Sequence, residues 1–505
     1  MIGSRPTGRN LLSYPPLPSR TAYPFFIGIC LGVLLAVPAP AGDVPFAGLY
    51  REALERQRKR YGPAHAKTAE AMMNLAWRLI QGGDFAGAAP VARESLAISE
   101  KLFGPSDIRS IDSLSALAAI AESRGDWRSA EALHRRAAGI QEASHASADP
   151  KLADLLLAQA RDVEEQGRLP EAYLLCRKAL QLQERISGPA HFAVAGILGR
   201  LASLREKQGD HAAAVKFWEQ ALSITSREKG ADQPETASVM SSLAKSLAAG
   251  GNMEAAGSLL RQSLAILQAT VGFAHPATAT AMSDLADLVK SQGDFTQAES
   301  LYTAALHIEE KAFGADDVHV GTAWNNLGSL RDLQGESQKA EELYRKALAI
   351  YEKRLPPEHP DIAVVLNNLA VVLNNREQFA AAEPLFRRAL TIYEKNPGLH
   401  SAGIAYTLTN LAAVVSARGD LALAERYCRR ALALWNSGGG SDPVDSQDAL
   451  RTLAFLRAAR NDFAAAIEFG DRALRVLERS APANDPRLAE LRKAVADWHA
   501  RRTPP

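Results

Sequence analysis

The chain has 505 residues, of which 47% are hydrophobic and only 6% aromatic, and its formal net charge at pH 7 is +1. Residues 1–41 contain three arginines and no acidic residue, so the rest of the chain is slightly acidic. This balance gives no electrostatic basis for binding nucleic acid or an anionic membrane surface, and we expect no nucleic-acid partner.

Residues 1–41 have the pattern of a secretory signal peptide. A polar, arginine-containing segment precedes residues 25–37, an apolar run of 13 residues that is too short for a relaxed membrane span. The small residues Ala39 and Ala41 follow on either side of Pro40. We therefore expect cleavage after Ala41 and export to the periplasm or the medium. One alternative is an uncleaved membrane anchor formed by residues 22–37, which is the route by which the chain would touch a membrane. The other is a start codon assigned too far upstream.

The remainder repeats one pattern every 42 residues. Each period holds two apolar stripes at helical spacing with a turn position between them, which predicts a helix, a tight turn and a second helix. The turn position is Gly in eight of ten periods, with Glu377 and Asn461 in the other two, and Ala stands five residues later in all ten. Because one helix pair cannot bury its apolar faces by itself, successive pairs must stack. The turn positions are 83, 125, 167, 209, 251, 293, 335, 377, 419 and 461.

The repeat register also divides the chain. Residues 42–62 keep the phase of a second helix and predict an N-terminal capping half-repeat. Residues 63–485 then hold the ten full repeats, and residues 486–505 form a C-terminal capping helix and tail. Half-repeats with charged outer faces cover the ends of a stacked array.

The residue pattern within a period resembles a known family. A period of 42 by itself would also suit HEAT or armadillo units. However, segments such as LNNLAVVL and AAAEPLFRRALTIYEK resemble tetratricopeptide repeats, in the longer version found in kinesin light chains and their bacterial relatives. The resemblance covers about residues 43–501. It implies an all-α superhelical solenoid of ten helix-turn-helix units with a half-repeat at each end, and it implies much less about function.

Asparagines recur on the first helices of three consecutive repeats. Asn326, Asn368 and Asn410 stand nine residues before the turn, and Asn325 and Asn367 lie beside two of them. In tetratricopeptide arrays the first helices line the concave groove, so the resemblance implies that these carboxamides bind the backbone of an extended peptide. The alternative is that they tie adjacent helices together.

Acidic residues mark the first helices of repeats two to four. They predict a solvated face, or else a surface for a basic or mixed-charge partner segment. The residues are Asp112, Glu122, Asp154, Glu164, Glu165 and Glu206.

Cysteines and histidines follow the repeat instead of forming a constellation. Cys176 and Cys428 occupy the same second-helix position six periods apart, which indicates packing residues. Four histidines recur in the loops between repeats, too far apart to converge on one ion. We expect no catalytic residues, no metal site and no cofactor. The four loop histidines are His65, His191, His275 and His359.

The resulting functional hypothesis is a non-enzymatic scaffold or adaptor that binds a peptide or protein partner. One alternative is a permanent structural component of an envelope assembly. Another is an enzyme with an unrecognised groove site, for example around Asp287, Lys290 and Lys245, although a charge pair on the helix surface explains those residues better.

Overall fold

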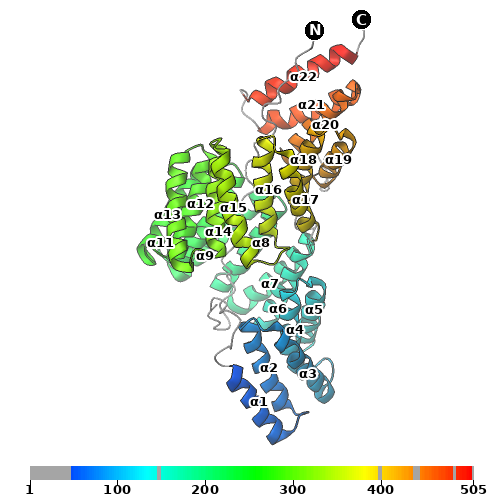
Figure 1. The fold of residues 1–505 in the computed structure, drawn as a ribbon. Helices are drawn as coiled ribbons and strands as arrows, with labels where there is room; N and C mark the ends of the chain where they lie inside the picture. Colours follow the sequence, from blue (N-terminus) through cyan, green and yellow to red (C-terminus); the bar gives the residue numbers. More distant parts are fainter. Residues whose placement is uncertain (1–46, 145–148, 396–400, 436–443, 481–484, 503–505) are drawn as a thin grey trace. The chain divides into compact units, whose positions relative to one another are not determined.

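The computed structural model describes residues 47–144, 149–395, 401–435, 444–480 and 485–502 (Figure 1). These residues form α-helices, connecting turns and short 3-10 helices such as Val444–Ser446, and they contain no strand. The expected signal segment lies outside the described residues. In the described ranges, no helix combines the length and the apolarity needed to cross a lipid bilayer.

The helices alternate between the first and second members of each predicted pair. The helix α1 (Ala47–Tyr61), within the predicted N-terminal half-repeat, precedes them, and α22 (Pro486–Arg502) follows them. The first helices are α2 (Ala66–Gln81), α4 (Ile111–Ser123), α6 (Pro150–Glu165), α8 (Phe192–Lys207), α10 (Pro234–Ala249), α12 (Pro276–Ser291), α14 (Val318–Leu333), α16 (Pro360–Asn375), α18 (Ser401–Ala417) and α20 (Gln447–Ala459). The second helices are α3 (Phe85–Phe103), α5 (Trp127–Ala143), α7 (Leu169–Ser187), α9 (His211–Lys229), α11 (Met253–Thr270), α13 (Phe295–Phe313), α15 (Ser337–Arg354), α17 (Phe379–Glu394), α19 (Leu421–Trp435) and α21 (Phe463–Ser480). The predicted all-α solenoid of stacked helix pairs is confirmed.

The helices fall into two compact units, one ending at Thr270 and one beginning at Val271. The first unit holds α1 to α11 and the second holds α12 to α22. The repeat register passes Thr270 without a change. Within each unit, each helix packs against the next one along the chain, as Figure 1 shows.

All ten predicted turn positions adopt a positive φ angle. Glycine reaches this left-handed region at no steric cost, which explains why eight of the ten are Gly. The two exceptions, Glu377 and Asn461, also have φ of 60°. The turn geometry is therefore set by the helix-pair packing, since it persists where the residue does not favour it.

We expect Glu377→Gly to stabilise the protein by about 0.5–1 kcal/mol, because it removes the steric cost of a side chain in the left-handed region. The gain is reduced by the extra freedom of glycine in the unfolded chain. Urea unfolding checks it. Gln378→Gly is the matched control, since Gln378 has φ of −86° and has no such strain to relieve. Equal shifts in both variants would show that the turn at Glu377 is unstrained.

The loop histidines cap first helices. The Nδ1 atoms of His65, His191, His275 and His359 each accept a hydrogen bond from the backbone N–H two residues later. An aspartate does the same at this loop position in other repeats, as Asp107 and Asp317 show. These side chains satisfy backbone donors that the first turn of a helix leaves without partners. Their recurrence is thus explained by helix capping.

Alanine at the fifth position after the turn forms the centre of every helix pair. All ten of these alanines are fully buried. A methyl group is small enough to let the two helices of a pair approach closely, and a larger side chain there would overpack the contact. The ten residues are Ala88, Ala130, Ala172, Ala214, Ala256, Ala298, Ala340, Ala382, Ala424 and Ala466.

Ion pairs connect the second helix of one repeat to the end of the next first helix. Glu383 accepts hydrogen bonds from Arg387, one turn later at 2.7 Å, and from Arg418 of the following repeat. The hydrogen bond from Arg387 holds the pKa of Glu383 below its ordinary value, and the one from Arg418 adds to this effect. Burial opposes the shift. The same position carries the same arrangement in Glu341 with Arg345 and Arg376, and in Glu425 with Arg429 and Arg460.

Candidate functional site

The five asparagines predicted to bind a peptide lie on α14, α16 and α18. All of them are buried, with relative exposures between 3% and 8%. The predicted peptide groove would require these carboxamides to face solvent, and in the structure they do not. Periodicity predicts the helix face on which a residue lies, but it does not predict how closely the next first helix packs against that face.

The buried amides bond to one another between repeats. Asn368 Nδ2 donates to Asn325 Oδ1 at 3.1 Å, which joins α16 to α14. Asn410 Nδ2 donates to Asn367 Oδ1 at 3.4 Å, and the hydroxyl of Thr407 donates to the same oxygen at 3.3 Å, which joins α18 to α16. This geometry agrees with the structural alternative for the asparagines. Their contact with a peptide stays a prediction.

Four of the acidic residues of repeats two to four have partners within the array. Glu164 on α6 pairs with Arg200 on α8 at 3.2 Å and with Lys207. Glu206 on α8 accepts from the indole N–H of Trp218 at 3.0 Å. Asp112 pairs with Lys151 at 2.8 Å and Glu122 with Arg161. Because cations already compensate the charges of Asp112, Glu122 and Glu164, these three carboxylates give little support to a basic partner segment.

The groups considered for an enzyme site include a charge pair on one helix. Lys290 Nζ lies 2.7 Å from Asp287 Oδ1, one turn away on α12. The hydroxyl of Tyr302 donates to the same oxygen, and Lys290 also donates to that hydroxyl at 2.9 Å. This is the charge pair expected for these two residues, with a tyrosine of the second helix added to it.

A family comparison decides the nature of the repeats. A family model described as "Tetratricopeptide repeat" matches residues 48–101, 193–269, 237–311, 277–353, 361–437 and 403–479, and a second model with the same description matches residues 113–144. These matches cover well over half of the chain. The chain belongs to the tetratricopeptide repeat family. Tetratricopeptide repeats generally mediate protein–protein interactions, and proteins built from them are typically non-enzymatic.

Solved structures with a tetratricopeptide-like fold resemble parts of the chain. BtubC (BKLC) from P. vanneervenii has 24% identity and a TM-score of 0.36, with 46% of this chain and 91% of that chain covered. A putative kinesin light chain from Podosopora anserina with nearly identical TPR-like repeats has 24% identity and a TM-score of 0.34, covering 41% and 97%. PilF from Pseudomonas aeruginosa has 20% identity and a TM-score of 0.35, covering 52% and 97%. No curated protein matches the chain significantly.

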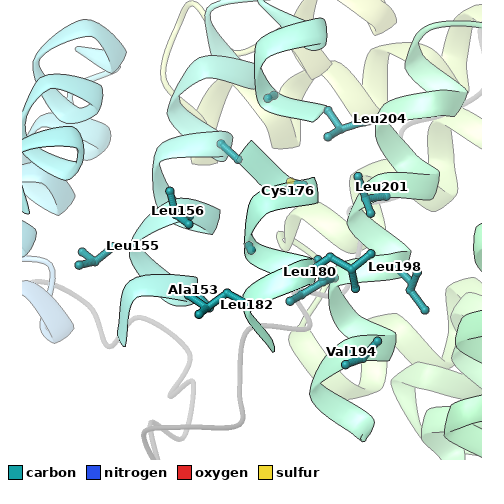
Figure 2. Close-up of a cluster of buried hydrophobic side chains, with 14 of the residues drawn as sticks. Ala153, Leu155, Leu156, Cys176, Leu180, Leu182, Val194, Leu198, Leu201 and Leu204 are labelled. Carbon is teal, nitrogen blue, oxygen red and sulfur yellow. The ribbon is translucent and has the colours of Figure 1, made fainter. Parts of the chain in front are cut away.

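The cysteines of this tetratricopeptide array are packing residues, as predicted. Cys176 lies among leucines of α6, α7 and α8, such as Leu156, Leu180 and Leu201 (Figure 2). Cys428 is also fully buried, and burial raises the pKa of both thiols. A buried thiol with a raised pKa is a poor nucleophile and a poor metal ligand.

One group of side chains was missed by the sequence reasoning. Glu122, His134 and Asp162, on α4, α5 and α6, have potential ligand atoms that all lie within 4.8 Å of one another. The available signal was a departure from the repeat, because His134 and Asp162 stand at positions that are otherwise mostly apolar.

A buried carboxyl group on α13 is expected to make the folding stability depend on pH. Glu309 is 8% exposed, and its Oε2 has no hydrogen-bond partner. Burial raises the pKa of Glu309 to about 8, and the nearby charge of Asp317 adds to the shift. The folded protein therefore keeps this proton at neutral pH, whereas the unfolded chain releases it near pH 4.5.

We expect Glu309→Gln to be more stable than the unmodified protein at pH 9 by on the order of 2–4 kcal/mol, with little difference at pH 4.5. Folding raises the pKa of Glu309, so the stability that is present below pH 4.5 is lost as pH rises from 4.5 to about 8. Glutamine mimics the protonated acid and does not titrate. Thermal unfolding across this range checks the prediction, with the exposed Glu342→Gln as control. A pH-independent difference between Glu309→Gln and the unmodified protein would contradict it.

Proposed function

We propose that this tetratricopeptide array is a non-enzymatic scaffold that binds an extended peptide, or a partner protein, along its first helices. The observation that carries the proposal is a row of half-exposed side chains at one repeat position, thirteen residues before the turn. In the unit that begins at Val271 this row contains Thr280, Thr322, Val364 and Tyr406.

The composition of this row suits a peptide. The hydroxyl groups of Thr280 and Thr322 donate to carbonyl groups of their own helices, and each keeps acceptor capacity for a peptide N–H. Val364 and the ring of Tyr406 offer apolar contact. Asn326, Asn368 and Asn410 lie four residues after the last three members of the row, so they share the same helix face one turn further along. In this proposal the half-exposed row contacts the partner, and the buried amides behind it hold the first helices at a fixed spacing.

The second helices are a less suitable surface. Their glutamates and arginines already pair with each other along the array, as Glu383 does with Arg387 and Arg418. A charged partner would have to compete with these internal ion pairs, and exposed pairs of this kind contribute little to binding.

Site-specific photo-crosslinking tests the proposal. A photoreactive phenylalanine analogue is placed at Thr322 or Val364 on the first helices, and at the exposed Arg345 or Arg387 on the second helices as matched controls. We expect one discrete adduct from an envelope extract with the first pair of positions and none with the second. Adducts from the second helices, or from neither surface, would contradict the proposal.

We also propose that the protein is exported, on the basis of residues 1–41, which lie outside the described part of the chain. The prediction is that the cellular protein begins at Gly42, because signal peptidases cut after small residues such as Ala39 and Ala41. Intact mass and N-terminal sequencing of the purified protein measure this. A cytosolic chain that retains residues 1–41 would contradict cleavage and export, and a retained segment in the membrane fraction would favour the anchor of residues 22–37.

A further inference from the structure

The repeat supplies an internal standard against which unusual residues stand out. His134 stands nine residues after the turn at Gly125, where all nine other repeats have an apolar or aromatic side chain or glycine, Cys176 and Phe386 among them. Asp162 stands five residues before the turn at Gly167, where seven of the ten repeats have Leu, Ile or Val. Two positions that are apolar in most repeats thus hold ionisable residues here.

The two exceptions lie in contact with each other. Nδ1 of His134 is 2.6 Å from Oδ2 of Asp162, and the two residues are 5% and 0% exposed. In the next repeat the corresponding positions hold Cys176 and Leu204, which belong to the apolar core shown in Figure 2. An apolar pair therefore fits this architecture, and packing does not explain the charged pair.

A third potential ligand comes from the preceding first helix. Oε1 of Glu122 is 3.9 Å from Nδ1 of His134, and the Glu122 side chain is 15% exposed. Arg161 pairs with Glu122, so two carboxylates beside one guanidinium leave the group negatively charged when ionised. Burial raises the pKa of Glu122, while the charge of Arg161 opposes the shift.

The state of one oxygen atom of Asp162 indicates that the group binds a ligand. Oδ1 of Asp162 is buried and makes no hydrogen bond, although Oδ2 of the same carboxylate bonds to His134. A buried carboxylate oxygen without a donor is costly, and a metal ion satisfies such an atom directly. The position could hold leucine, as it does in the next repeat, so a bound cation accounts for an arrangement that is otherwise unfavourable.

We propose that Glu122, His134 and Asp162 bind one divalent transition-metal ion of the Zn²⁺ class. One imidazole nitrogen and two carboxylate oxygens are donors that zinc accepts, whereas Mg²⁺ and Ca²⁺ prefer oxygen ligands throughout. When the ion binds Nδ1 of His134, the neutral imidazole carries its one proton on Nε2. Bound there, it ties together three helices from two consecutive repeats.

Zinc titration of the full chain, after chelator treatment and removal of the chelator, tests the site. Calorimetry gives the stoichiometry and thermal unfolding gives the stabilisation. We expect one zinc equivalent that the variant His134→Phe/Asp162→Val does not bind, and a rise in melting temperature of about 5 °C or more at hundredfold excess over the dissociation constant. The variant copies the pair Phe386 and Val414, both fully buried in the core of a later repeat, and is expected to fold.

Two further variants sharpen the result. Glu122→Gln preserves shape and is expected to weaken zinc binding at least tenfold, because second and third ligands contribute strongly to affinity. His191→Ala removes an exposed capping histidine, and this variant is expected still to bind one equivalent of zinc. The proposal is overturned if the unmodified chain binds no zinc, or if it and the double variant bind the same number of equivalents with the same thermal shift.

Discussion

Deleting residues 294–335 is expected to leave a folded, soluble and fully helical protein that is one repeat shorter. The deletion removes α13 and α14 and joins Gly293, the turn after α12, to Glu336, the residue that precedes α15. The new helix pair has the same register as the old ones, since Ala340 comes to stand five residues after the turn. In repeat arrays each unit contacts only its neighbours, so the remaining interfaces are preserved.

A half-period deletion is the matched control. Removing residues 294–314 takes out α13 and brings two first helices, α12 and α14, into succession. The apolar faces that packed on α13 then lose their partner, and we expect lower helicity per residue and aggregation. Circular dichroism and size-exclusion chromatography compare the two proteins. Similar losses in both deletions would show that the 42-residue period is not the unit of folding.

The turn and the core of each repeat could be predicted because a single steric requirement determines each of them. The turn needs a residue with a positive φ angle, so glycine recurs at eight of the ten positions. That recurrence allowed the turn at Glu377 to be predicted from its place in the period, although its side chain disfavours a positive φ. The close approach of two helices needs a side chain as small as a methyl group. This requirement explains why Ala340 and its nine counterparts recur and are buried. Requirements that recur ten times leave a clear trace in a single sequence.

The environment of the asparagines could not be predicted in the same way. A helix position such as that of Asn368 faces outward from its own helix pair, and the sequence does not show whether water, a peptide or the next first helix lies opposite. In the structure it is Asn325 of the preceding repeat. The group around His134 was missed for a different reason, because a search for recurrence passes over the repeats that break the pattern.

The last prediction concerns Asn326, Asn368 and Asn410 changed together to alanine. We expect a loss of about 1.5–4.5 kcal/mol in stability, because Asn368→Ala leaves the buried oxygen of Asn325 without its donor, at about 1–3 kcal/mol. Asn410→Ala removes one of two donors to Asn367 Oδ1, which keeps the Thr407 hydroxyl, so this change costs about 0.5–1.5 kcal/mol. For a unit of this size the melting temperature is expected to fall by about 5–15 °C.

The control variant changes three exposed polar residues on second helices, Thr303, Gln338 and Thr391, to alanine. It also removes three polar side chains, but it leaves the contacts between first helices in place, and its melting temperature is expected to change by less than about 2 °C. Melting curves and partner capture are measured on both variants at a temperature where both are folded. Partner binding lost at an unchanged melting temperature in the asparagine variant would assign these amides to recognition. A lowered melting temperature with binding retained assigns them to the spacing of the first helices, and leaves recognition to the half-exposed row that includes Thr322 and Val364.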